Sequence, residues 1–130
     1  MWEIGTDLAV LLADGPLRAL RARRAHRRLR AGRPFRIPCA VRSERPGWPA
    51  EYRDGRLLFT PGGRTAVFTC RAFPGLEFAL GGEHHDPEPE AWYDQDWAAT
   101  GYLPPDGGPA LLVQVHTRYL VTTKLALQGA

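Results

Sequence analysis

The chain has 130 residues, which suits one compact core and leaves too little chain for a second. Hydrophobic residues make up 44% and charged residues 24%, which is ordinary globular usage and excludes a disordered or a membrane-embedded protein. The net charge of +3 hides an asymmetry: residues 1–36 carry nine arginines against three acids, whereas residues 37–130 carry eight basic and eleven acidic side chains.

Two parts are predicted from this pattern: a basic helical arm over residues 1–33 and a β-rich domain over residues 34–130. The 14 glycines and 12 prolines fall between short apolar runs, as turns fall between strands. We therefore expect a mainly β fold, a small barrel or sandwich, with an N-terminal α-helical arm.

The arm is predicted as two helical segments separated at residues 14–16 by Asp-Gly-Pro. The second segment, residues 17–31, has no acidic residue, and its arginines point in nearly every direction at helical spacing. They leave a narrow stripe of Ala22, Ala25 and Leu29. We expect this helix to bury little, and to project from the domain or meet an acidic partner. Its arginines are Arg18, Arg21, Arg23, Arg24, Arg27, Arg28 and Arg30.

The strands begin where the hydrophobic period changes from about four to two. Residues 35–41 alternate apolar and polar side chains, as a half-buried strand does, and Pro38 favours an edge position. A second strand region is predicted over residues 51–60, with a turn at Asp54-Gly55. Two short strands are expected at residues 65–72 and 76–80.

The last third leaves two assignments open. Residues 91–100 fit a short helix or an irregular strand. Residues 111–116 form a β-branched run that predicts a strand, and residues 119–127 fit either the partner of that strand in a hairpin or a terminal helix.

Few residues suggest chemistry. Glu83-His84-His85-Asp86 places four candidate ligands side by side, but neighbours in sequence rarely converge on one ion. His116 lies in an apolar strand, which favours a structural role. Cys39 and Cys70 are predicted to be free thiols in strands. We therefore expect no catalytic residue, no metal site, no cofactor and no enzymatic activity.

The charge layout predicts a binding or adaptor protein whose seven helical arginines dock on a protein partner or an anionic surface. The partner can be the acidic surface of a second copy, since eight acids and no lysine or arginine lie between Arg71 and Arg118. An anionic membrane is a further candidate. Nucleic acid is an alternative that the acidic domain disfavours, and a subunit of a homo-oligomeric or larger assembly is another.

Exposed aromatic residues form a second candidate surface. Trp48 lies in a proline-rich loop, and Trp92 and Trp97 lie in the acidic stretch. Such rings either cap the ends of a small barrel or contact a partner. No segment approaches the roughly 20 apolar residues that span a bilayer. A cytoplasmic protein, with peripheral membrane contact as a further option, is the expectation.

The order of features resembles a family of small actinobacterial proteins of unknown function. The matching features are the passage from Leu8 to Arg30, the strand Pro34–Arg42, and Gly47-Trp48 followed by Gly55–Phe59. The family has an apolar N-terminal anchor, an arginine-rich stretch and a β domain of pleckstrin-homology-like (PH-like) type. This chain differs in having a shorter apolar segment and an acidic insert. The resemblance implies a PH-like fold and a binding role without a known ligand.

Overall fold

The computed structural model describes residues 2–60, 62–87 and 96–129, with side chains from residue 16 onward. In these ranges a long helix comes first, strands follow, and a short helix comes last. The elements are α1 (Trp2–Ala31), β1 (Phe35–Ser43), β2 (Arg53–Phe59), β3 (Thr65–Thr69), β4 (Leu76–Ala79), β5 (Glu83–His85), β6 (Trp97–Leu103), β7 (Leu111–His116), the 3₁₀ turn η1 (Thr117–Tyr119) and α2 (Leu120–Leu127).

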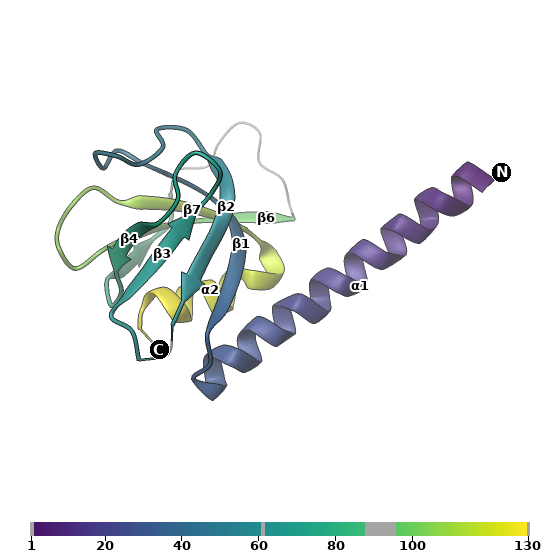
Figure 1. Ribbon diagram of the computed structural model, residues 1–130, viewed down its shortest axis with the longest axis horizontal. Coiled ribbons are helices and arrows are strands. Elements are labelled where there is room, and N and C mark those ends of the chain that lie inside the picture. The colour runs from purple at the N-terminus through teal and green to yellow at the C-terminus, as the bar shows by residue number, and fades with distance from the viewer. Residues whose placement is uncertain (1, 61, 88–95, 130) are drawn as a thin grey trace.

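The strands form one antiparallel sheet in the order β4-β3-β2-β1-β7-β6-β5. The sheet curls into an open barrel, with α2 packed across one end and α1 running away from that end (Figure 1). Two meanders, β1–β4 and β5–β7, are joined through β1 and β7, and α2 follows them. The predicted class, a mainly β fold with an N-terminal helix, is confirmed, and of the two expected architectures, barrel and sandwich, the sheet forms the open barrel.

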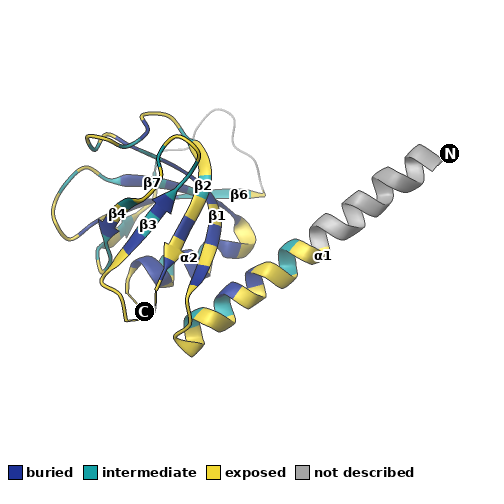
Figure 2. Cartoon of the chain, in the orientation of Figure 1, coloured by how far each residue is buried: buried dark blue, intermediate teal, exposed yellow. Residues whose placement is uncertain are grey.

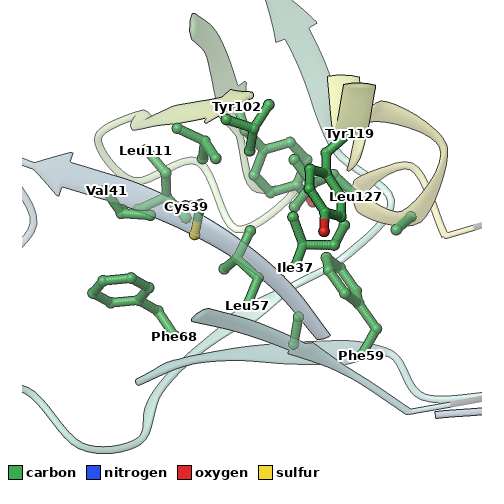
Figure 3. Packing of buried hydrophobic residues seen from close by; sticks show 14 of the residues in the cluster. Ile37, Cys39, Val41, Leu57, Phe59, Phe68, Tyr102, Leu111, Tyr119 and Leu127 are labelled. Atoms are coloured by element: carbon green, nitrogen blue, oxygen red, sulfur yellow. The ribbon is translucent and has the colours of Figure 1, made fainter. Parts of the chain in front are cut away.

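The core lies inside the curl of the sheet. On β1, Phe35, Ile37, Cys39 and Val41 are buried, as the period-two pattern predicts (Figure 2). Side chains from several strands and from α2 meet these residues in one cluster (Figure 3). Because almost all of this core comes from the strands and α2, the barrel has its own hydrophobic centre and α1 is packed at its margin.

Residues 119–127 settle as a helix after the η1 turn, which decides the alternative left open by the sequence. Thr123 donates its hydroxyl to the carbonyl of Tyr119, one turn earlier, at 2.7 Å. The backbone amide of Gly81 donates to the carbonyl of Leu127 at 2.9 Å and ties the helix end to the sheet. The expected strand at residues 111–116 is confirmed as β7.

Helix α1 runs without a break, so the predicted interruption at residues 14–16 is wrong. Pro16 lies inside the helix, where its ring removes one backbone hydrogen bond without ending the helix. The helix does end at the predicted place. Gly32 adopts a φ of 66°, and its amide donates to the carbonyl of Leu29. No helix in the described ranges combines the length and apolar character needed to cross a membrane.

Strand β2 passes straight through Asp54 and Gly55, so the predicted turn there is wrong. Gly55 pairs with Cys39 of β1. A Cβ atom at residue 55 would collide with the backbone oxygen of Thr69 and approach Cys70 Cβ to 2.9 Å. The glycine therefore permits the close approach of the neighbouring chain.

Replacing this glycine tests the close approach. We expect Gly55→Ala to lower the free energy of unfolding by about 1–3 kcal/mol, because the added methyl group has no space without a backbone shift. Urea denaturation measures the change. Asp54→Ala, at the exposed neighbouring position, is the control and should stay within about 0.5 kcal/mol of the parent. Equal stability of the two variants would contradict the packing described here.

Candidate functional site

Helix α1 docks on the barrel through a stripe of small side chains. Ala22 and Ala25 are only 7% and 5% exposed, and Leu29 is half-buried against the core. Phe35 and Tyr119 belong to the same buried cluster. The stripe is the one that the sequence predicts, and through it the helix contacts β1, η1 and α2. The described part of the helix therefore meets the apolar end of the barrel.

A polar contact accompanies the stripe. Nδ1 of His26, on α1, lies 3.0 Å from the hydroxyl oxygen of Thr122, on α2. Thr122 is buried and His26 is half-buried. The hydrogen bond fixes the rotation of the helix about its axis, because only one face of α1 can present residues 22, 25 and 26 to the barrel.

The sheet leaves room for the helix beside β1. The first five residues of β1 pair with β2 alone, and pairing with β7 starts only at Ala40, opposite Gln114. Pro38, which lacks a backbone N–H, lies in this half-paired stretch. The prediction that Pro38 lies in an edge strand is thus wrong, because β1 is central in the sheet. Residues 35–39 of this central strand nevertheless have a strand neighbour on one side only.

Arginines border the docked stripe on one side and line a first hollow, of about 360 Å³. We call it the β-side hollow, because it lies between α1 and strands β1 and β2. Its apolar lining comes from Ala25, Phe35, Pro38 and Tyr119. Its arginines are exposed and come from three elements: Arg21, Arg24 and Arg28 of α1, Arg36 of β1 and Arg56 of β2.

A second hollow, of about 470 Å³, lies on the opposite side of the stripe. We call it the α-side hollow, because it lies between α1 and α2. Arg23 and Arg27 of α1 and Arg118 of η1 supply its charge, and His26 borders it. The rest of its lining is largely apolar or small: Ala19, Ala22, Val121 and Thr122.

Neither hollow is lined by a carboxylate from the described part of the chain. Elsewhere in the described part of the chain, a salt bridge joins Arg45, which follows β1, to Asp106 of the loop between β6 and β7 at 2.6 Å. The Arg45 guanidinium holds the pKa of the Asp106 carboxyl below its usual range. Within the described ranges, no such carboxylate pairs with the arginines of the two hollows.

The seven predicted arginines divide into groups. Five of them line the two hollows. Arg18 is half-buried on the docking side of α1, and Arg30 is exposed and lines neither hollow. Three arginines of the hollows lie outside the helix and were missed: Arg36, Arg56 and Arg118. The alternation along β1 predicts that the Arg36 side chain points outward. Its proximity to Arg56, however, depends on the register between β1 and β2.

The candidate aromatic surface divides differently. Trp48 is half-buried and stacks on Phe68 at 6.1 Å between ring centroids, with Phe78 at its edge. It therefore covers the rim of the core. Trp97 is half-buried and packs its ring against His116 at 5.8 Å. Trp92 lies outside the described residues, and an aromatic binding surface stays a prediction.

The residues considered for metal binding or nucleophilic chemistry are not brought together. Within the described ranges, no three His, Cys, Asp or Glu side chains gather in a way that could hold a metal ion. Both cysteines are free. Burial raises the pKa of the Cys39 thiol to about 12, so this thiol stays protonated at neutral pH.

His84 of β5 turns inward and joins the sheet to α2. Its Nε2–H donates to the carbonyl of Lys124 at 3.1 Å, and its Nδ1 accepts from the hydroxyl of Thr100 at 3.1 Å. This arrangement uses the neutral ring. Burial lowers the pKa of His84 from its ordinary value of 6.5, opposed by the bond to the Lys124 carbonyl.

A pH dependence of stability follows. As pH falls through 6.5 the unfolded chain takes up a proton at His84, whereas the folded chain takes it up only at a lower pH. The contribution of His84 to the stability of the fold is thus complete above pH 6.5, and it is lost as the pH falls toward the pKa of His84 in the folded chain. Urea denaturation between about pH 8 and about pH 5 should show a shallower decline for His84→Phe than for the parent. The exposed His85→Gln control removes only a minor influence on the pKa of His84, so its slope should stay close to that of the parent. Identical slopes for all three proteins would contradict this role.

Comparisons with known proteins add little. No protein-family model and no curated protein matches the chain. Among solved structures, one of Vav1 inhibited by an allosteric inhibitor is similar at 12% identity, with a TM-score of 0.49. The match covers 77% of this chain and 28% of that one, so the chain spans less than a third of the Vav1 chain. The resemblance to the actinobacterial family stays a prediction.

Proposed function

We propose that the protein is a non-enzymatic binding module that docks on an anionic partner through the arginines around the docked part of α1. The observation that supports the proposal is the set of residues that line the two hollows. They gather eight arginines from four elements, and no described carboxylate lines either one.

Side chains that share a hollow repel one another, and an anion that enters between them replaces repulsion with attraction. Docking of α1 already fixes the backbone positions from which the arginine side chains extend, so a ligand need not order the backbone. Guanidinium groups stay charged at any physiological pH and offer several N–H donors each. Such groups suit binding, since they do not release a proton to act as a base.

The outer surface of α1 favours one class of anionic partner. Leu17 and Leu20 are 47% and 58% exposed, next to the arginine-rich turns. Exposed leucines beside arginines suit a membrane surface that contains anionic lipids, where apolar and charged contacts add together. We therefore propose a cytoplasmic protein that attaches peripherally to such a surface, with acidic proteins as the other partner class.

Removing helical charge tests the proposal. Arg21, Arg24, Arg27 and Arg28 are all replaced by glutamine, and binding to phosphatidylserine vesicles is measured by sedimentation. We expect the affinity to fall by roughly a thousandfold, because each arginine near an anionic surface contributes about 1 kcal/mol. Binding of the parent should weaken as salt is added.

The control removes four exposed arginines elsewhere, at positions 33, 53, 64 and 71. It loses the same total charge, so retained binding in this variant assigns the effect to α1. Parallel titrations use polyglutamate and duplex DNA, and light scattering of the protein alone tests self-assembly. Tight binding to DNA in preference to vesicles would favour the nucleic-acid alternative. Failure of every anion to bind, or equal loss in both variants, would reject the proposal.

A further inference from the structure

The β-side hollow differs from an evenly charged surface in having two walls. Arg21, Arg24 and Arg28 follow one another at i, i+3 and i+7 on α1, which places them on one face of the helix. Arg36 and Arg56 stand on the other wall, formed by the sheet. The hollow therefore has guanidinium groups on opposite sides of one space.

Strand register explains the pair on the sheet wall. Arg36 lies opposite Leu58, and Arg56 lies opposite Pro38, so the two arginines are diagonal neighbours across β1 and β2. Both lie at outward positions of the alternation and are exposed. Asp54 follows on the same face of β2, two residues from Arg56, but it does not line the hollow.

The aromatic residue in the lining adds a neutral donor. Tyr119 is buried in the cluster beneath α1 and also borders the hollow. Burial raises the pKa of Tyr119, and the nearby Arg21 and Arg18 guanidinium groups oppose that rise. The phenol therefore remains protonated at neutral pH, where it can donate to an anion that also contacts Arg21.

The number of arginines that line the β-side hollow indicates the class of ligand. One carboxylate would balance only one of the five guanidinium groups. Neighbouring phosphate groups bring several charges and many acceptor oxygens into a small volume, and the planar guanidinium binds phosphate with two parallel hydrogen bonds. About 360 Å³ falls within the size range of sites for small ligands.

From this geometry we infer that the β-side hollow binds a compact group of two or more linked or neighbouring phosphates, held between α1 and the outer face of β1 and β2. The inference rests on the proposed function, because it names the chemistry of the anion. The α-side hollow is not the site, since it holds three arginines among largely apolar residues.

The test uses inorganic tripolyphosphate and isothermal titration calorimetry on the full chain. The parent should bind one equivalent. Arg36→Gln with Arg56→Gln should weaken binding by about a hundredfold, because each lost charged hydrogen bond costs about tenfold. The matched control, Arg23→Gln with Arg27→Gln, removes the same charge from the α-side hollow and should weaken binding only about threefold, through lost long-range attraction.

Thermal unfolding supplies a second measurement. A ligand that bridges α1 and the sheet binds the folded protein alone, so tripolyphosphate should raise the Tm of the parent and of the control. At the same tripolyphosphate concentration it should raise the Tm of the Arg36/Arg56 variant much less, because binding there is about a hundredfold weaker. Equal Tm values of the three unliganded proteins show that the substitutions do not disturb the fold, as expected for exposed side chains.

A competition experiment distinguishes phosphates of a lipid headgroup from those of a soluble compound. If the ligand is a lipid headgroup, vesicles with phosphatidic acid displace tripolyphosphate at a lower lipid concentration than phosphatidylserine vesicles of equal charge. If it is a soluble compound, the two kinds of vesicle displace tripolyphosphate equally. The inference is overturned if tripolyphosphate does not bind while other anions still do, or if the two double variants lose affinity equally; the proposed function then stands. If no anion binds at all, both fail.

Discussion

Two alanines set how closely the arginine-bearing helix approaches the barrel. Ala22 and Ala25 are almost fully buried, and their small side chains let the α1 backbone lie close to Phe35 and Tyr119. Longer side chains at these positions would hold the helix away from the sheet and widen the space beside it. The arginines that flank this stripe would then face open solvent on one side. Close docking is therefore the condition for a hollow with two charged walls.

The docking surface is small compared with the core that it joins. Most of the buried cluster comes from the strands and from α2, and the described part of α1 contributes two alanines, with Leu29 packed against them. The apolar gain from methyl groups is modest, and repulsion among the guanidinium groups of helix and sheet acts against it. The His26 to Thr122 hydrogen bond helps to fix the orientation. The position of α1 is thus balanced between weak attraction and repulsion, and counter-charge shifts that balance.

Much of this arrangement is local enough to be read from the sequence. The alternation over residues 35–41, the β7 run and the Ala22, Ala25 and Leu29 stripe each depend on spacing along one element, and each is found as predicted. The C-terminal helix had a readable signal too. Its buried residues fall at helical spacing, although their β-branched neighbours favoured a strand. They are Thr122, Thr123, Ala126 and Leu127, in line with the buried Tyr119 of the preceding η1 turn.

What the sequence did not reveal depends on contacts between elements. The glycine at position 55 is typical of a turn in isolation, and only the approach of the chain around Thr69 explains it. Arg36 and Arg56 are twenty residues apart and meet through strand register, while the opposing arginines come from a helix. The same dependence has a thermodynamic consequence, because the hollow exists only when α1 is docked. By linkage, an anion that binds the docked state more tightly also stabilises the docked helix. Any change that destabilises docking lowers the binding free energy of that anion to the same extent.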